Sequence, residues 1–178
     1  MDATLPEVPQ ILDLDPLVCL YLDLPTHNNM STKDVLTQAA ARLSGFSPEE
    51  VWELLKYLSE SAPAIPEPLQ EELLKLLRTP DHKIRRTLYR IIGRGGLQFN
   101  GLILAEQLDW ESDPVAKSLL IDAIASLGLK EVLPLLKHHL AQTPSPEGSE
   151  PSAIAVVRGS LKNAVAALTS PPRFRAHS

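Results

Sequence analysis

The sequence has a single cysteine, no basic excess and no long apolar run, and each absence narrows the class of protein. Cys19 cannot form a disulfide within the chain, which favours a reducing compartment. The formal charge of -5 disfavours a general binder of nucleic acid or anionic membranes, because such proteins carry basic residues that neutralise phosphates. No apolar run reaches the ~20 residues that a membrane-spanning helix needs, and the first residues lack the features of a secretory signal. We therefore expect a cytoplasmic protein whose partners are proteins.

Residues that could carry catalysis or hold a metal are scattered along the chain. The five histidines do not cluster, and the adjacent His138 and His139 would point about 100° apart on a helix, so one ion could not bind both from the same face. Cys19 lies among leucines, which favours a buried inert thiol over a nucleophile. The glycines at 93, 95 and 96 follow a predicted helix, whereas a phosphate-binding loop opens one. We expect no enzymatic activity, no metal site and no cofactor.

Apolar residues at helical spacing are what the sequence does have. With 178 residues and 44% hydrophobic composition, the chain can bury the core of one domain. Ser31 caps a first helix that ends near Gly45, and Ser47 caps a second helix that Pro63 stops. The stretch 16–26 before them fits either a helix or a short strand, because its leucines alternate after an Asp-Pro pair.

Two later stretches are copies of one helix-turn-helix unit. Residues 73–86 align with residues 104–117, about 31 residues farther along. A unit of this size buries its apolar face only against neighbouring units, so the copies predict a helical stack that presents surface instead of chemistry. The expected helices of this region run over 69–77, 82–93, 101–108, 114–127, 130–141 and 153–168.

The second copy carries a resemblance to a known repeat. Ser112-Asp113-Pro114-Val115, followed by Leu127-Gly128 and the run Glu131 to Leu136, resembles a HEAT repeat of the bacterial kind found in phycobilisome bilin lyases and their non-enzymatic relatives. The segment Asp81 to Arg85 with Gly93 gives a weaker match, and the resemblance extends over about residues 66–168. It implies an all-α fold, in which an N-terminal helical hairpin, with room for one short strand, precedes a right-handed stack of about three HEAT-like helix pairs.

The predicted organisation has four parts. Residues 1–15 form a flexible N-terminus, 16–63 a helical capping region, 64–168 the repeat region with a loop at 142–152, and 169–178 a flexible tail. The tail contains Arg173-Phe174-Arg175, which fits either a short docking peptide or an unstructured end.

Residues 18–67 carry a fainter, second resemblance. The order of Ser31-Thr32-Lys33-Asp34, Pro48-Glu49-Glu50-Val51 and Ala64-Ile65-Pro66 is similar to the first half of a nitrogen-type phosphotransferase-system IIA domain. That family places its phosphorylated histidine directly after the Ala-Ile-Pro, where this chain has Glu67. The resemblance implies a degenerate regulatory domain of a transporter, unable to accept a phosphoryl group, with a β-sheet before residue 65.

A local reversal of charge marks the candidate binding site. Residues 75–94 contain seven Lys/Arg against one acid, Asp81. At helical spacing, four of these cations form one stripe beside an apolar face: Lys83, Arg86, Arg90 and Arg94. The stripe could bind a partner, because the planar guanidinium group of arginine binds carboxylates and phosphates through two hydrogen bonds. The alternative interpretation is that the stripe is a solvated helix face whose cations pair with acids of the next helix. Trp110 is expected in a loop between two helices. We include it among the candidate partner-binding residues, because an exposed tryptophan there could contact a partner, whereas a tryptophan packed inside the molecule could not.

These features together predict a non-catalytic adaptor or scaffold that binds an acidic protein surface through the basic stripe. The first resemblance supplies an alternative, a phycobiliprotein bilin lyase or chaperone-like protein, and the second supplies a regulatory domain of a transporter. Reading of DNA by the helices around Gly45 is disfavoured, because the second of them begins with three carboxylates that phosphates would repel. We expect no specific nucleic acid and no transmembrane segment, while peripheral association with a membrane complex is compatible with the sequence.

Overall fold

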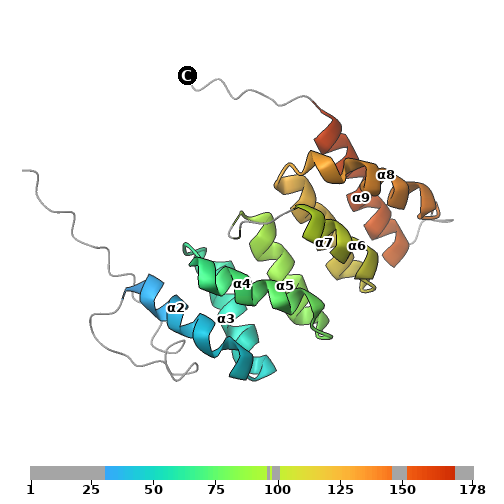
Figure 1. Cartoon of the computed structure of the whole chain (residues 1–178). Coiled ribbons are helices and arrows are strands. Elements are labelled where there is room, and N and C mark those ends of the chain that lie inside the picture. Colours follow the sequence, from blue (N-terminus) through green and yellow to red (C-terminus); the bar gives the residue numbers. More distant parts are fainter. Residues whose placement is uncertain (1–30, 96, 98–100, 146–151, 171–178) are drawn as a thin grey trace, which may run out of the picture.

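The computed structural model describes residues 31–95, 97, 101–145 and 152–170, and the regular elements of this part of the chain are all helices (Figure 1). The α-helices are α2 (Thr32–Arg42), α3 (Pro48–Ser61), α4 (Glu67–Lys75), α5 (His82–Gly93), α6 (Gly101–Trp110), α7 (Pro114–Ser126), α8 (Leu133–Gln142) and α9 (Ala153–Thr169). Three short 3-10 helices adjoin them: η1 (Leu43–Gly45), η2 (Leu76–Arg78) and η3 (Lys130–Val132). The predicted all-α fold is confirmed.

Helices α3, α5, α7 and α9 each begin at a residue whose side-chain oxygen accepts a hydrogen bond from the first turn. These capping residues are Ser47, Asp81, Asp113 and Ser152. Such caps satisfy backbone N–H groups that a helix start leaves without a partner. Ser31 caps α2 in the same way. Ser31 and Ser47, which the sequence predicts as caps, therefore determine where α2 and α3 begin.

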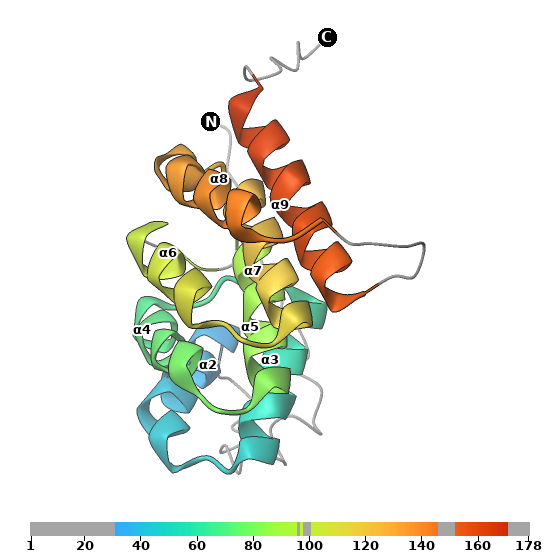
Figure 2. The ribbon, with the colours of Figure 1, turned by 90° about the vertical axis from the view of Figure 1, so that its right-hand side faces the viewer.

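The helices form two layers that alternate along the chain. Helices α3, α5, α7 and α9 lie side by side in that order, each packed on the next (Figure 2). Helices α2, α4, α6 and α8 form the other layer, in which α2 packs on α4. Each helix of one layer is followed by a helix of the other, so the described chain is a series of four helix pairs.

The core lies between the two layers and consists of aliphatic side chains from both. The apolar stripe predicted for α3 is buried, and the same holds for the stripes of the later helices. Burying one leucine fully contributes about 1.5–3 kcal/mol. The fully buried leucines of this core are Leu54, Leu55, Leu69, Leu73, Leu88, Leu104, Leu108, Leu120, Leu136 and Leu161.

At two positions the structure explains why the residue is a glycine. Gly93 is the last residue of α5, and a Cβ at this position would lie 3.2 Å from the Cα of Ala123 on α7, so its lack of a side chain allows α5 and α7 to approach closely. Gly128 follows α7 with a φ of +68°, a left-handed conformation that favours glycine.

The structure differs from the sequence predictions at several helix ends. Helix α6 continues to Trp110, which was expected in a loop, and α2 and α4 finish in the 3-10 turns η1 and η2. The predicted flexible ends, the 16–26 stretch with Cys19, and the Arg173-Phe174-Arg175 peptide lie outside the described residues. Across the described helices, none combines the length and apolar character that crossing a membrane requires.

Candidate interaction surface on helix α5

Helix α5 separates its apolar and basic residues onto different faces. Asp81 begins the helix by accepting a hydrogen bond of 2.8 Å from the backbone N–H of Lys83. Ile84, Leu88, Ile91 and Ile92 are buried in the core. The remaining face carries the predicted stripe, which we call the α5 row: Lys83, Arg86, Arg90 and Arg94.

Arg86 is the most firmly held member of the α5 row. Its Nε and Nη2 donate to the two carboxylate oxygens of Asp113 at 2.9 and 2.8 Å, and Asp113 also accepts a 2.7 Å hydrogen bond from the backbone of Ala116. The hydrogen bond from Arg86 is the main reason that the pKa of Asp113 falls to about 2. Arg86 therefore connects α5 to the start of α7, and its charge is balanced within the molecule.

The other members of the row are more exposed. Arg94 donates through Nη1 to the carbonyl oxygen of Ser59, which connects the end of α5 to α3. Lys83 and Arg90 are exposed and form no ion pair with the described residues. The alternative interpretation, pairing with acids of the next helix, therefore describes Arg86 but not Lys83 or Arg90.

The two ends of the α5 row adjoin hollows of opposite character. Next to Lys83, a hollow of about 270 Å³ is lined by Trp52 and by three carboxylates, from Glu49, Glu53 and Asp81. At the other end is a hollow of about 350 Å³, which we call the Arg94 hollow, since Arg94 is the one charged residue among the described residues of its lining. Its other walls are apolar side chains and backbone from α3, α5 and the α3–α4 connection. An acidic ligand is therefore favoured inside the Arg94 hollow and disfavoured inside the hollow next to Lys83, whereas the exposed cations between the two hollows remain open to carboxylates.

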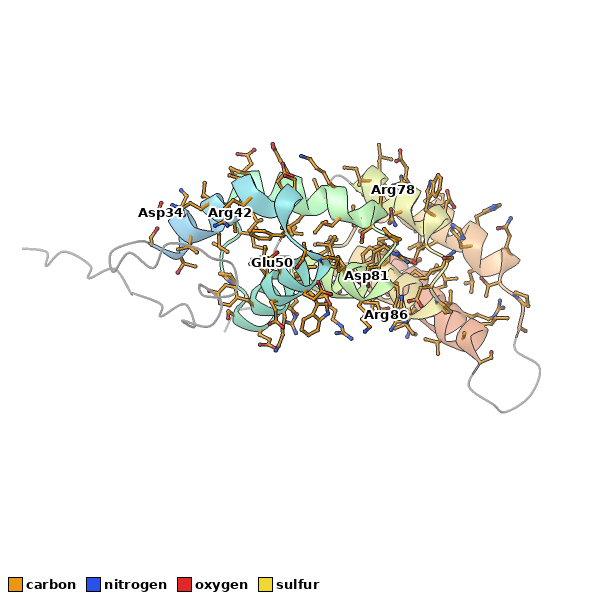
Figure 3. The ribbon with its side chains drawn as sticks, turned by 90° about the horizontal axis from the view of Figure 1, so that it is seen from below. Asp34, Arg42, Glu50, Arg78, Asp81 and Arg86 are labelled. Carbon is orange, nitrogen blue, oxygen red and sulfur yellow. The ribbon has the colours of Figure 1, made fainter. Side chains whose placement is uncertain are left out.

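Trp110 lies on the other layer, away from the α5 row. Its side chain is 71% exposed, and the guanidinium carbon of Arg78 lies 4.8 Å from the centre of its ring. Figure 3 shows Arg78 and Arg86 on opposite layers of the molecule. Leu102 and Ile103 of α6 are exposed as well, and we refer to these two residues and Trp110 together as the α6 patch. The five residues predicted for one site are thus divided between two surfaces.

A buried charged cluster was not predicted from the sequence. Arg85, next to Arg86, donates through Nε and Nη2 to the two oxygens of Glu111, both at 2.8 Å, and the hydroxyl of Tyr89 donates to the same carboxylate at 2.9 Å. Burial alone would raise the pKa of Glu111, but the hydrogen bonds from Arg85, the backbone of Asp113 and Tyr89 outweigh it, and the pKa is lowered. Arg85 also donates to the carbonyl oxygens of Thr79 and Pro80.

The geometry of this cluster indicates a structural role. The Glu111 side chain is completely buried, and it is saturated by the donors of Arg85, Tyr89 and Asp113. Arg85 counted toward the charge reversal in the sequence, but its partner lies 26 residues away in the α6–α7 connection. No local pattern connects residues at that separation.

His139 lies at a third hollow, between α7, α8 and the start of α9. This hollow of about 420 Å³ is lined in part by Lys117, His139 and Ile154. His139 lies 3.0 Å from Asp109 through Nε2, and burial is the main cause of its lowered pKa. Over the described residues, no group of three or more His, Cys, Asp or Glu side chains is arranged to hold a metal ion. Glu67, the residue at the histidine position of the IIA resemblance, is exposed as the first residue of α4.

Comparisons of this chain with protein-family models, with curated proteins and with solved structures gave no match.

Proposed function

We propose that this protein is a non-catalytic adaptor, built as a stack of HEAT-like helix pairs, that binds an acidic protein surface through the α5 row. The observation that carries the proposal is the exposure of Lys83 and Arg90, without an internal ion pair among the described residues, beside Arg86 and Arg94. Four cations on one helix face attract carboxylates over a distance comparable to the screening length of physiological salt, about 8 Å.

The two tethered arginines add to this argument. Arg86 is held by Asp113, and Arg94 is held by the backbone of Ser59. A side chain that is already ordered loses less rotamer freedom when a partner binds, which saves about 0.5–1.5 kcal/mol for each such side chain. The row therefore combines two fixed guanidinium groups with two cations, Lys83 and Arg90, that form no ion pair in the described part of the chain and that a partner can pair.

The spacing of the helix pairs supports the HEAT-like part of the proposal. Ser47 and Asp81 are 34 residues apart, Asp81 and Asp113 are 32 residues apart, and each of them caps a helix of the same layer. A structural unit recurring at this period, packed mainly on its neighbours, is typical of helical repeat proteins, which use extended surfaces for binding.

Capture of a partner from the source cells tests the proposal. We would compare the full chain with the double variant Lys83→Glu/Arg90→Glu, because neither side chain forms an ion pair with the described residues whose loss would disturb the fold. The expected result is an acidic partner captured by the wild type and reduced about ten-fold or more in the variant, which corresponds to 1.4 kcal/mol or more.

The matched control is Lys137→Glu/Lys162→Glu, which changes the net charge equally at exposed positions of α8 and α9. It should capture the partner as the wild type does, and circular dichroism should show equal helicity in all three proteins. Equal capture by the wild type and Lys83→Glu/Arg90→Glu would contradict the proposal.

A further inference from the structure

The net negative charge of this chain comes from its first 30 residues. Residues 1–30 contain five Asp/Glu and neither Lys nor Arg, so the other 148 residues contain 17 acidic and 17 basic residues. The formal charge of -5 is thus the charge of the first segment alone. A segment of one sign and a helix face of the opposite sign within one chain attract each other.

The same segment is strongly apolar. Residues 11–24 read Ile-Leu-Asp-Leu-Asp-Pro-Leu-Val-Cys-Leu-Tyr-Leu-Asp-Leu, in which ten of the 14 residues are apolar and three are aspartate. Each large aliphatic side chain that leaves water for an apolar site contributes about 1.5–3 kcal/mol when fully buried. The segment therefore suits a surface that provides both an apolar hollow and cations, and it does not suit a purely polar surface.

The Arg94 end of the α5 row provides this combination. The Arg94 hollow, about 350 Å³ in volume, is walled by Leu58, Ile65 and Ile91, and the part of its lining that the structure describes contains no carboxylate. Arg94 lines the hollow, and Arg90 lies about one helical turn before it in α5. The hollow next to Lys83 has three carboxylates in its lining and would repel the aspartates.

The chain connectivity brings the segment to the correct end of the molecule. Ser31 caps α2, and α2 turns back through η1 into α3, so the start of α2 and the end of α3 lie at the same end of this helix pair (Figure 2). The Arg94 hollow is formed at the end of α3. Residues 25–30 can span up to about 20 Å when extended, more than the ~10 Å diameter of one helix.

We propose that residues 11–24 dock on the α5 row, with apolar side chains in the Arg94 hollow and aspartates beside Arg90 and Arg94. The chain's own acidic segment then occupies the surface to which an acidic partner would bind. An external partner would then have to displace the segment, and this regulatory consequence rests on the proposed function. The contact between the segment and the α5 row does not depend on the proposed function.

The single cysteine makes this contact measurable in the full chain. A nitroxide spin label on Cys19 should broaden the backbone amide signals of residues 90–95 and of residues 58–65, relative to the same protein with the label reduced. Signals of α7 and α9 should keep their intensity. Raising the salt concentration from 50 to 500 mM should weaken the effect, since part of the attraction is between charges.

Charge reversal supplies the specific control. Arg90→Glu should reduce the broadening, Asp13→Lys/Asp15→Lys should reduce it as well, and the combination of both should restore it in part. Lys162→Glu on α9 should leave it unchanged. Broadening centred on the α6 patch, broadening spread evenly over the molecule, or broadening insensitive to Arg90→Glu would overturn the docking proposal.

The capture experiment separates this proposal from the proposed function. If the label leaves α5 unaffected while Lys83→Glu/Arg90→Glu still loses the captured partner, only the docking proposal fails. If α5 is broadened as expected and capture is the same in the wild type and that variant, only the adaptor function fails.

Discussion

Arg85 and Arg86 are adjacent in the sequence, yet the structure gives them different environments. Arg85 is nearly buried against Glu111, whereas Arg86 lies on the exposed face of α5 and pairs with Asp113. The sequence predicted the cluster of basic residues, but it could not show which of them are paired. Their acidic partners lie 26 and 27 residues away, and side-chain spacing within a helix identifies neighbours only three or four residues apart.

The buried carboxylate predicts a large effect on stability. Glu111→Gln keeps the volume of the side chain but removes the charge that compensates Arg85, and one amide cannot accept all the hydrogen bonds that the carboxylate accepts. We expect the free energy of unfolding to fall by about 2–4 kcal/mol, measured by urea unfolding followed by circular dichroism.

The control for this change is Glu106→Gln, whose exposed carboxylate lies 3.8 Å from Arg78. Such a pair contributes little, so the free energy of unfolding should change by less than about 0.5 kcal/mol. A loss of similar size in both variants would mean that the Glu111 cluster does not have the structural role assigned to it.

The positions of the helices were largely predictable from the sequence, because the residues that begin a helix act locally. The predicted bounds of 82–93 are those of α5, and Ser31 and Ser47 cap α2 and α3 as expected. Helix ends were less predictable. Helix α6 continues to Trp110 because no glycine or proline ends the helix before that residue. Trp110 is therefore part of a helix and does not lie in a loop.

The approach of α5 to α7 gives a prediction at this scale. Gly93→Leu would place a large side chain where even a Cβ lies 3.2 Å from the backbone of Ala123, so the two helices would have to separate. We expect the free energy of unfolding to fall by about 1–3 kcal/mol in thermal or urea unfolding.

The comparison is Gly159→Ala within α9, where a Cβ meets no atom within 4 Å. Because alanine favours a helix over glycine, this variant should be more stable by about 0.5–1 kcal/mol. The prediction fails if Gly93→Leu is as stable as the wild type, since α5 and α7 would then not be in close contact at Gly93.

The whole molecule presents two surfaces where the sequence indicated one. The α5 row lies on one layer and Trp110 on the other, with Arg78 over its ring. A linear pattern gives the face of each helix but not the layer to which the helix belongs, so residues from α5 and α6 could not be separated before the fold was known. The described residues also form four consecutive helix pairs.

The central claim is that the exposed face of α5 binds acidic protein surface. Its most direct test is a titration of the ¹⁵N-labelled full chain with a 20-residue poly-glutamate peptide, followed by the backbone amide shifts. The account predicts shifts concentrated at residues 83–95, which are lost in 500 mM salt and absent in Lys83→Glu/Arg90→Glu. Shifts at the α6 patch, or shifts that persist in that variant, would contradict it.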